Sequence, residues 1–510
     1  YRAYSLKGWV LETFDEATGV WTESETGTDA SYDWTPDPAV RARLTWLYDR
    51  DAVMYKVTAE TERTTDQALV GTYIKENVEF APAAEGNFWT AGTKITATAI
   101  ADTTDLSAGV GDSRCYRSRF LRWVGDTDGL DVDLTNPSIT FAVDRSRTLH
   151  AVFDRDWLLI YNGGDSFMHN ANWRFKASID TGKRTVTVKN WTRGSGRLNF
   201  DTPVYGQSGT AYTITAVSDE ATAYSGGKAK TTITELILPK TLVTLGGQAF
   251  RMNEITNLVM DCPELTYVGA ATLARNYKLQ TAAVNLPSLV SVTADYPFFN
   301  WPLLDTDLAT WNLSSLTNVP KQLLYQEVGV AAAQAAACKS GVLTLPVVRH
   351  VASGAFENFA QAAEFHIGTG NAKLVEIADS AFKACAATNF VLGCRREISV
   401  HQNAFLNHLK AGPDSIRFIA RAPAAKEVME SILASNTPEH KANVYVSAVR
   451  ESDWSGYVMP VDEIDDATVK AEAETAGATG AFKTDAGEWK ALVFAVEMPF
   501  DPKGGIFLLR

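Results

Sequence analysis

Apolar residues recur in a fixed order between Ile233 and Ile416. The clearest copy, residues 233–250, reads I-T-E-L-I-L-P-K-T-L-V-T-L-G-G-Q-A-F. It ends on Ala-Phe, as do later copies that close at Phe356, Phe382 and Phe405. The spacing is 23 residues from Phe250 to Leu273, 26 from Phe356 to Phe382 and 23 from Phe382 to Phe405. Such a period predicts a solenoid, because one short coil cannot bury its own apolar face and must stack on its neighbours.

Each position of the phrase has a physical meaning. Leu236 and Leu238 flank one outward residue of a short strand, and Pro239 ends that strand because it lacks a backbone donor. Gly246 allows a tight bend, and Phe250 fills the centre of the coil. The length is in the leucine-rich-repeat range, and seven or eight coils fit between residues 230 and 420. With strands about 4.8 Å apart, the face of the stack is roughly 35 Å long.

Two segments, 296–307 and 325–341, break the period. Insertions in solenoids map to loops, often on the binding face. The second insertion is rich in Ala, which favours one or two extra helical turns. The first concentrates large aromatic side chains, which serve as anchors for protein partners or sugar rings when they are exposed. The ligand-binding candidates are Phe298, Phe299, Trp301 and Trp311. The alternative is that these rings fill the core of an irregular repeat.

The first 155 residues predict β structure in two related units, residues 1–51 and residues 52–155. Alternation of β-branched and small residues over 94–99 indicates a half-buried strand, and Asn136-Pro137 marks a turn. The units end on similar phrases, which align Leu44, Leu47, Tyr48 and Asp49 with Leu149, Val152, Phe153 and Asp154. The shorter first unit is a partial copy of the second.

The remaining segments flank the repeats. Residues 156–229 alternate as strands at 184–189 and 211–217, and we expect them to cap the open end of the solenoid. Residues 421–510 form a second cap and a small β/α tail. Within this tail the pattern predicts a helix over 423–433, a strand over 443–446, a linker or short helix over 467–480, and final strands over 489–496 and 505–510. The predicted fold class is therefore mainly β with some α, small β modules preceding a solenoid.

Two resemblances accompany these patterns. The repeats resemble the BspA type of leucine-rich repeat, whose consensus is close to I-T-x-I-x-I-P-x-S-V-T-x-I-G-x-x-A-F. The first two units resemble divergent InlB-type B-repeats, in which a Thr/Ala-rich strand, an F-x-x-W-x-G segment and a closing A-x-F strand recur; here these are 95–99, 120–125 and 151–153. The resemblance implies a bacterial surface protein in which such modules serve as stalks, spacers or adhesive units.

Composition narrows the function further. The net charge of −13 over 510 residues argues against nucleic acid, which requires clustered Lys and Arg. No apolar run approaches the roughly 20 residues of a membrane helix. The absence of an initial methionine leads us to expect that a leader or further modules precede Tyr1. Five cysteines form no C-x-x-C pair; Cys385 and Cys394 could bridge in a secreted protein, although buried thiols are a common alternative.

Catalytic motifs are weak. The strand-like run 157–162 followed by Gly-Gly-Asp-Ser resembles the nucleophile block of SGNH-type hydrolases, but none of the seven histidines has the Asp three residues earlier that this family uses. A turn after a strand is the alternative. Four carboxylates, Asp126, Asp128, Asp131 and Asp133, suggest calcium, although their order departs from known loops and a solvated hairpin fits as well. His401 and His408 lack a third ligand for zinc.

We therefore expect a non-enzymatic, extracellular or cell-surface bacterial protein without cofactors. Its expected work is adhesion or ligand capture, with a host protein, another bacterial surface or a glycan as partner. An alternative is a scaffolding part of a larger secreted enzyme, and another is a glycan-binding protein of nutrient uptake. Because a fold does not fix a function, these expectations follow from the resemblance.

Overall fold

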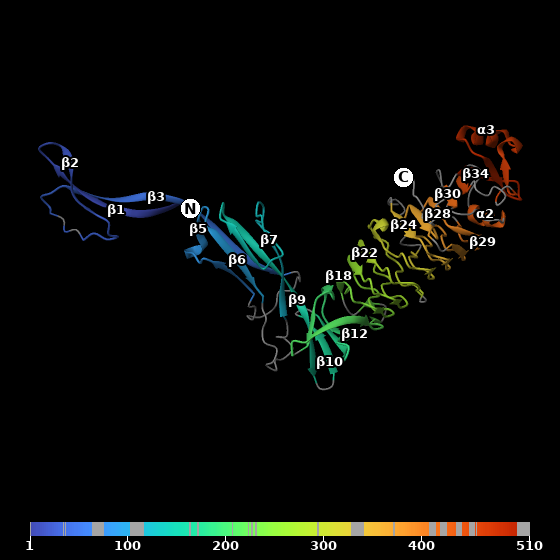
Figure 1. The fold of residues 1–510 in the computed structure, drawn as a ribbon, viewed down its shortest axis with the longest axis horizontal. Coiled ribbons are helices and arrows are strands. Elements are labelled where there is room, and N and C mark those ends of the chain that lie inside the picture. Colours follow the sequence, from blue (N-terminus) through green and yellow to red (C-terminus); the bar gives the residue numbers. More distant parts are fainter. Residues whose placement is uncertain are drawn as a thin grey trace. The chain divides into compact units, whose positions relative to one another are not determined.

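A computed structural model shows a mainly β protein (Figure 1). It describes residues 2–33, 35, 37–63, 76–101, 117–162, 165–170, 173–206, 208–222, 224–225, 228–229, 232–292, 295–327, 341–370, 373–406, 415–418, 426–434, 441–447, 454 and 456–496. The chain divides into two compact units, with the boundary between Arg155 and Asp156.

Unit 1 begins with an antiparallel sheet of β1 (Arg2–Asp15), β2 (Val20–Gly27) and β3 (Ala42–Arg63). Its core is thin, with Trp9 and Leu11 buried. On an exposed face, Arg43 donates two hydrogen bonds of 2.6 and 2.9 Å to the Glu12 carboxylate and lies over the ring of Trp21. The predicted module boundary at residues 51/52 falls inside β3, which continues into the next sheet.

The rest of unit 1 contains two small sheets. β3 pairs with β5 (Phe88–Thr90) and in parallel with β9 (Arg147–Asn162), which also pairs with β7 (Arg117–Gly125). The second sheet consists of β4 (Asn77–Ala81), β6 (Lys94–Ile100) and β8 (Ser138–Ala142), and a 3-10 turn, η1 (Glu85–Asn87), precedes β5. The predicted strand over 94–99 is confirmed, since alternate residues of β6 are buried. The core includes Val57, Ile95, Trp123 and Phe153.

Unit 2 opens with the second half of β9, which pairs with β10 (Asp165–His169). β11 (Arg174–Asp180), β12 (Thr185–Arg193), β13 (Gly196–Asn199), β14 (Val204–Gly206) and β15 (Ala211–Val217) follow, with the short pair β16 (Tyr224–Ser225) and β17 (Lys228–Ala229). The predicted strands over 184–189 and 211–217 are confirmed as β12 and β15. Trp157 and Trp173 are fully buried and donate their indole N–H groups to the carbonyls of Asn199 and Arg197.

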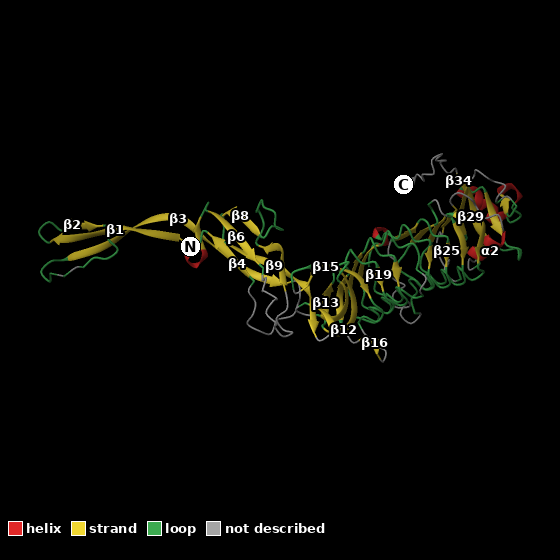
Figure 2. Cartoon of the chain, turned by 60° about the horizontal axis from the view of Figure 1, so that its bottom comes forward, coloured by secondary structure: helices red, strands yellow, loops and turns green. Residues whose placement is uncertain are grey.

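From residue 233 onward, successive turns of the chain, here called coils, contribute strands to two sets of parallel ladders (Figure 2). One long-strand ladder consists of β13, β18 (Ile233–Ile237), β20 (Asn257–Asp261) and β22 (Thr281–Asn285). A second consists of β24 (Val342–Leu345), β26 (Glu364–Ile367), β28 (Asn389–Leu392) and β30 (Ser415–Phe418). One short-strand ladder consists of β15, β19 (Thr244–Leu245) and β21 (Tyr267–Val268). A second consists of β23 (Asn318–Val319), β25 (His350–Val351), β27 (Leu374–Ile377) and β29 (Cys394–Val400). A 3-10 turn, η2 (Leu308–Thr310), lies between β22 and β23.

The phenylalanines of the repeated phrase form the centre of the coils. Phe356 stacks on Phe382 at 5.3 Å between ring centroids, and Phe382 stacks on Phe405 at 5.1 Å. A second stack joins Phe365 of β26 to Phe390 of β28 at 5.7 Å, and edge contacts connect the two stacks. Ring burial and stacking between neighbouring coils therefore replace the core that one coil cannot form alone.

Close backbone approach explains the glycine of the phrase. A Cβ atom on Gly246 would lie 2.4 Å from the Asp219 backbone nitrogen, and one on Gly269 would lie 2.3 Å from that of Gly247. Both are thus required by packing between coils rather than by a left-handed backbone. Left-handed residues instead stand directly before Ala-Phe, where Gln248, Gly354 and Ser380 have φ of 53°, 63° and 56°.

The end of unit 2 extends the long-strand ladder. β30 pairs with β31 (Ala442–Ser447), which pairs in parallel with β34 (Trp489–Val496), followed by β33 (Gly480–Lys483) and β32 (Val458–Pro460). The predicted helix appears as α2 (Lys426–Leu433). The segment predicted as a linker or short helix is α3 (Ala467–Ala476), which follows the 3-10 turn η4 (Val461–Glu463) and is capped by Asp466 and by left-handed Gly477. The strand predicted over 505–510 and residues 328–340 of the insert predicted over 325–341 lie outside the described residues.

Candidate binding surface

The four aromatic candidates lie in the core. Phe298, Phe299, Trp301 and Trp311 are 2, 8, 1 and 6 % exposed. Trp301 donates its indole N–H to the carbonyl of Leu273 at 2.9 Å, and Trp311 donates to that of Ala282 at 2.9 Å. Each indole thus connects its coil to an earlier one and satisfies its polar atom within the protein. The prediction that these rings form an exposed contact site is wrong, and the alternative, that they fill the core of irregular coils, is confirmed.

The acidic loop of unit 1 is organised by an arginine. The guanidinium of Arg147 is buried; it donates 2.9 Å hydrogen bonds to the carbonyls of Asp126 and Asp128 and one of 2.8 Å to the carboxylate of Asp144. The carboxylate of Asp126 accepts from the backbone N–H of Thr148.

The remaining carboxylates of this loop also do not converge. Asp133 accepts from the backbone and hydroxyl of Thr135, as in an Asx turn. Within the described residues, which include Asp126, Asp128, Asp131 and Asp133, no three metal-ligating side chains come together. The structure therefore does not support the calcium alternative, because a protein cation already binds the carbonyl oxygens of the loop.

The other chemical motifs also have structural explanations. Asp165 and Ser166 lie in β10, which pairs antiparallel with β9 and places Ser166 opposite Tyr161, whereas Gly163 and Gly164 of the predicted turn lie outside the described residues. His401 lies 3.0 Å from the Asp379 carboxylate, whereas His408 lies outside the described residues. Cys394 is a buried free thiol, so it does not bridge to Cys385. Burial raises the pKa of the Cys394 thiol to about 12.

A row of outward-facing side chains runs along the short-strand ladders. Strand pairing places the members side by side in two runs, one from Ala216 to Tyr267 and one from Ser291 to Ser399, and each member occupies the same position of its coil. The members from the first to the last rung are Ala216, Thr244, Tyr267, Ser291, Asn318, His350, Glu376 and Ser399. The inward neighbours of several members, such as Val268, Val319, Val351 and Ile377, are buried. The row is thus the solvent face of a packed ladder.

In its middle, the row borders a groove of about 490 Å³. Ser291, Asn318, His350 and Glu376 of the row line it, together with Asp295 and Lys321 from the turn that follows the short strand. The imidazole Nδ1 of His350 lies 3.3 Å from a carboxylate oxygen of Glu376. The ammonium of Lys321 lies 5.9 Å from the ring of Tyr296. The groove therefore offers hydroxyl, amide, imidazole, carboxylate and ammonium groups on a rigid ladder.

These groups are suited to hydrogen bonding with a polar ligand. His350 and Glu376 provide a donor–acceptor pair, Asn318 can donate and accept, and Asp295 and Lys321 place opposite charges at the edge of the groove. The sequence contained the signal for this row, since each member stands between the two inward apolar residues of its short strand. Aligning the copies at that position, rather than searching for motifs, would have found it.

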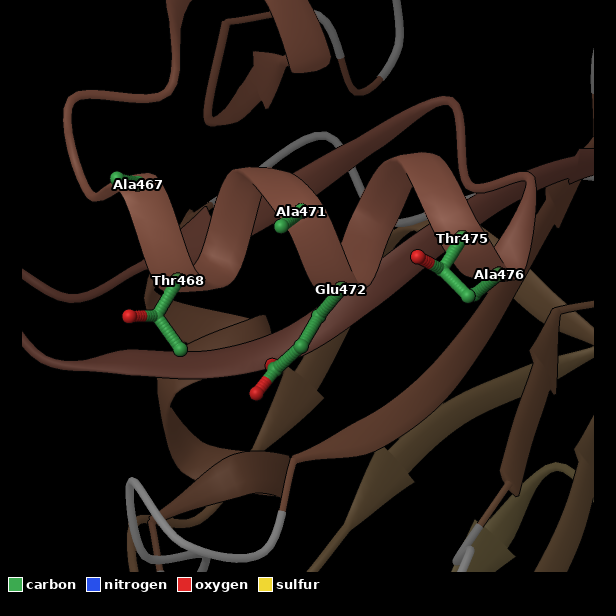
Figure 3. Close-up of a pocket in the computed structure, with 6 residues that line it drawn as sticks. All are labelled: Ala467, Thr468, Ala471, Glu472, Thr475 and Ala476. Carbon is green, nitrogen blue, oxygen red and sulfur yellow. The ribbon is translucent and has the colours of Figure 1, made fainter.

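A second recess lies along α3 and is less informative. All six lining residues, among them Thr468, Glu472 and Thr475, come from that one helix (Figure 3). Glu472 is also engaged by Lys441 at 2.8 Å. Small side chains on a single helix face provide no converging groups, so this recess is not a site.

Comparison with known proteins adds no assignment: no protein-family model matches the sequence, and no curated protein matches it either. Among the described residues, no helix is long and apolar enough to cross a membrane.

Proposed function

We propose that the coils form a BspA-type leucine-rich-repeat solenoid and that the chain is a bacterial surface or secreted protein that binds a ligand on its short-strand face. The observation that carries this proposal is the row from Ala216 to Ser399 with its polar groove. A continuous face of adjacent strands is the surface that stacked repeats present to partners. Adhesion or ligand capture, without a catalytic step, is the function that this surface supports best.

The repeated phrase supports the solenoid. Leu236, Leu258 and Ala282 occupy equivalent inward positions of three paired strands and are all buried, while the residue that follows each of them in its strand is more exposed. Packing in this register makes each coil the support of the next. The groove side chains of Asn318, His350 and Glu376 are therefore held by paired strands, which limits the entropy that a bound ligand must remove.

A glycan is the second candidate ligand, and Tyr267 favours it. Its side chain is 47 % exposed, and its coil precedes that of Ser291. An exposed aromatic ring at the same position of its coil as the carboxylate and amide groups of the row suits a sugar, which stacks one face on the ring and hydrogen-bonds through its hydroxyls. In this case the protein would serve nutrient uptake or the targeting of a larger secreted enzyme.

The test is a binding screen of the chain on a glycan array and on an array of extracellular matrix proteins. The groove variant combines Asn318→Ala, His350→Ala and Glu376→Ala. Since these side chains are solvent-facing, we expect unchanged stability and at least a tenfold loss of affinity for any ligand that the native chain captures.

A matched control alters the long-strand face with Thr344→Ala, Val391→Ala and Arg417→Ala, which occupy one register position of β24, β28 and β30. This control should bind like the native chain. Loss of binding in the control with retention in the groove variant would contradict the proposed location. Binding to neither array would contradict the proposed function.

A further inference from the structure

β3 closes the first module of unit 1 in the same way as β9 closes the second module. The sequence aligns Leu44 with Leu149 and Asp49 with Asp154, so residues 42–48 of β3 correspond to residues 147–153 of β9. The structure supports this equivalence, because each segment pairs with the strand two places earlier in the chain, β1 or β7. The other edge of each segment can therefore be compared directly.

In the second module that edge is occupied. Residues Val57–Arg63 of β3 pair in parallel with Arg147–Phe153 of β9. Leu149, Ala151 and Phe153 of the closing strand are then fully buried. In the first module, β1 is the described strand that pairs with residues 42–49, and within the described part of the chain no strand covers the opposite edge. Leu47 on this segment remains 40 % exposed.

Backbone polarity shows which groups the open edge presents. Phe14 donates its N–H to the carbonyl of Arg41 at 2.7 Å, so Arg41 faces β1. Because the direction alternates along a strand, Arg43 and Thr45 also face β1, and Ala42, Leu44 and Trp46 direct their N–H and C=O groups to the open edge.

The same analysis of β9 gives the same answer. Asp126, which directly follows β7, donates its N–H to the carbonyl of Thr148 at 2.9 Å, so Leu149 and Ala151 face β3. The alignment places Leu44 on Leu149 and Trp46 on Ala151. The sequence alignment and the hydrogen-bond geometry thus identify the same edge independently.

We propose that the open edge of β3, residues 42–48, receives in parallel the opening strand of another module of this kind. Its chemistry is that of Val57–Arg63, V-T-A-E-T-E-R: an extended segment of seven residues, without Gly or Pro, that begins with small and β-branched residues and carries its charges in the second half. Addition of such a strand satisfies three N–H and three C=O groups and reduces the exposure of Leu47, which is the general mode of recognition by β-augmentation. This interaction is independent of the groove in unit 2.

The experiment titrates the full chain with a synthetic peptide that has the sequence of residues 54–63. We expect saturable one-to-one binding by calorimetry. Hydrogen exchange should show new protection at the amides of Ala42, Leu44 and Trp46, while Arg43 and Thr45, which already face β1, should change little. In a control peptide, Thr58→Pro and Ala59→Pro remove one N–H from each of the two edges of the peptide strand, so that one is lost whichever edge pairs with β3. This peptide should bind at least tenfold more weakly.

The matched chain variant is Leu44→Pro, which removes an N–H from the open edge and leaves the hydrogen bonds of β1 intact. It should also weaken peptide binding at least tenfold. Should this variant fail to fold, the proline peptide and the exchange pattern decide the question. Equal binding of both peptides, protection outside residues 42–48, or no binding would overturn the proposal. A dimer in sedimentation, with the amides of Ala42, Leu44 and Trp46 already protected before peptide is added, would overturn it in favour of edge-to-edge self-association.

Discussion

At the scale of single residues, Arg147 determines the conformation of the acidic loop. A buried guanidinium is unfavourable unless its donors are paired, and here a carboxylate and two carbonyls accept from it. The side chain of Arg147 is 1 % exposed, whereas that of Asp144 is 60 % exposed. The sequence showed four carboxylates and suggested a metal. It could not show that an arginine fourteen or more residues later occupies the centre of their loop.

This pairing predicts a dependence of stability on pH. The hydrogen bond from Arg147 holds the pKa of Asp144 below its usual value of about 3.9. A lowered pKa in the folded state adds stability above the pKa of the unfolded chain, and this stability is lost as the pH falls through the folded pKa. The difference in unfolding free energy between the native chain and Asp144→Asn should therefore be constant above about pH 5 and shrink below about pH 4.

The measurement is urea unfolding at each pH. After equilibration, a short hydrogen-exchange pulse at one common pH reports the fraction unfolded from the amides of β8 and β9. Asp133→Asn serves as a control for a carboxylate with a lowered pKa that does not contact Arg147. A native–Asp144→Asn difference that grows as the solution becomes more acidic would contradict the assignment of this carboxylate to Arg147.

At the scale of the element, the irregular coils depend on tryptophans that reach back to earlier coils. Trp301 contacts Phe298 at 5.2 Å and Trp311 at 6.5 Å between ring centroids, and its indole N–H is satisfied by Leu273. Where the phrase departs from its period, a large ring and one hydrogen bond replace the missing leucines. The residues with the strongest appearance of a binding site are therefore structural.

Substitution of Trp301 separates these two roles. Trp301→Phe removes the indole hydrogen bond and should lower the free energy of unfolding by about 1–2 kcal/mol, and Trp301→Ala should lower it by about 3–5 kcal/mol. Both variants should retain native ligand affinity in the array screen under conditions in which they are folded. Denaturant unfolding supplies the first measurement. Lost affinity at unchanged stability would show that this ring contacts the ligand.

The strands could be predicted from sequence better than the site. The alternation of β6 and the phrase of β18 directly report which residues are buried, because burial sets the period. The binding groove depends on features of the fold that the periodicity of the sequence does not show. Gln248 and Ser380 adopt a left-handed backbone without being glycine, and the burial of Trp301 depends on coils before it in the chain. The groove residues share a register rather than a motif, so no local pattern marks them.

At the scale of the whole molecule, the account of unit 2 rests on the stacking of coils. Parallel pairing puts Asn318 beside His350 and His350 beside Glu376, in segments separated by an insertion and by a full repeat. Neighbouring strands lie about 4.8 Å apart, which makes the row from Ser291 to Ser399 a continuous surface. If the coils were arranged in another order, the groove and the proposed binding face would not exist.

Cysteine cross-linking across adjacent rungs tests this order most directly. Asn318→Cys with His350→Cys places two Cα atoms about 5 Å apart, within the range of about 4.4–6.8 Å that a disulfide spans. Mild oxidation followed by peptide mapping should find this bridge in high yield. Asn318→Cys with Thr344→Cys, which lies in a long-strand ladder, should give little or none. Efficient bridging of the second pair and none of the first would show that the coils do not stack in this register.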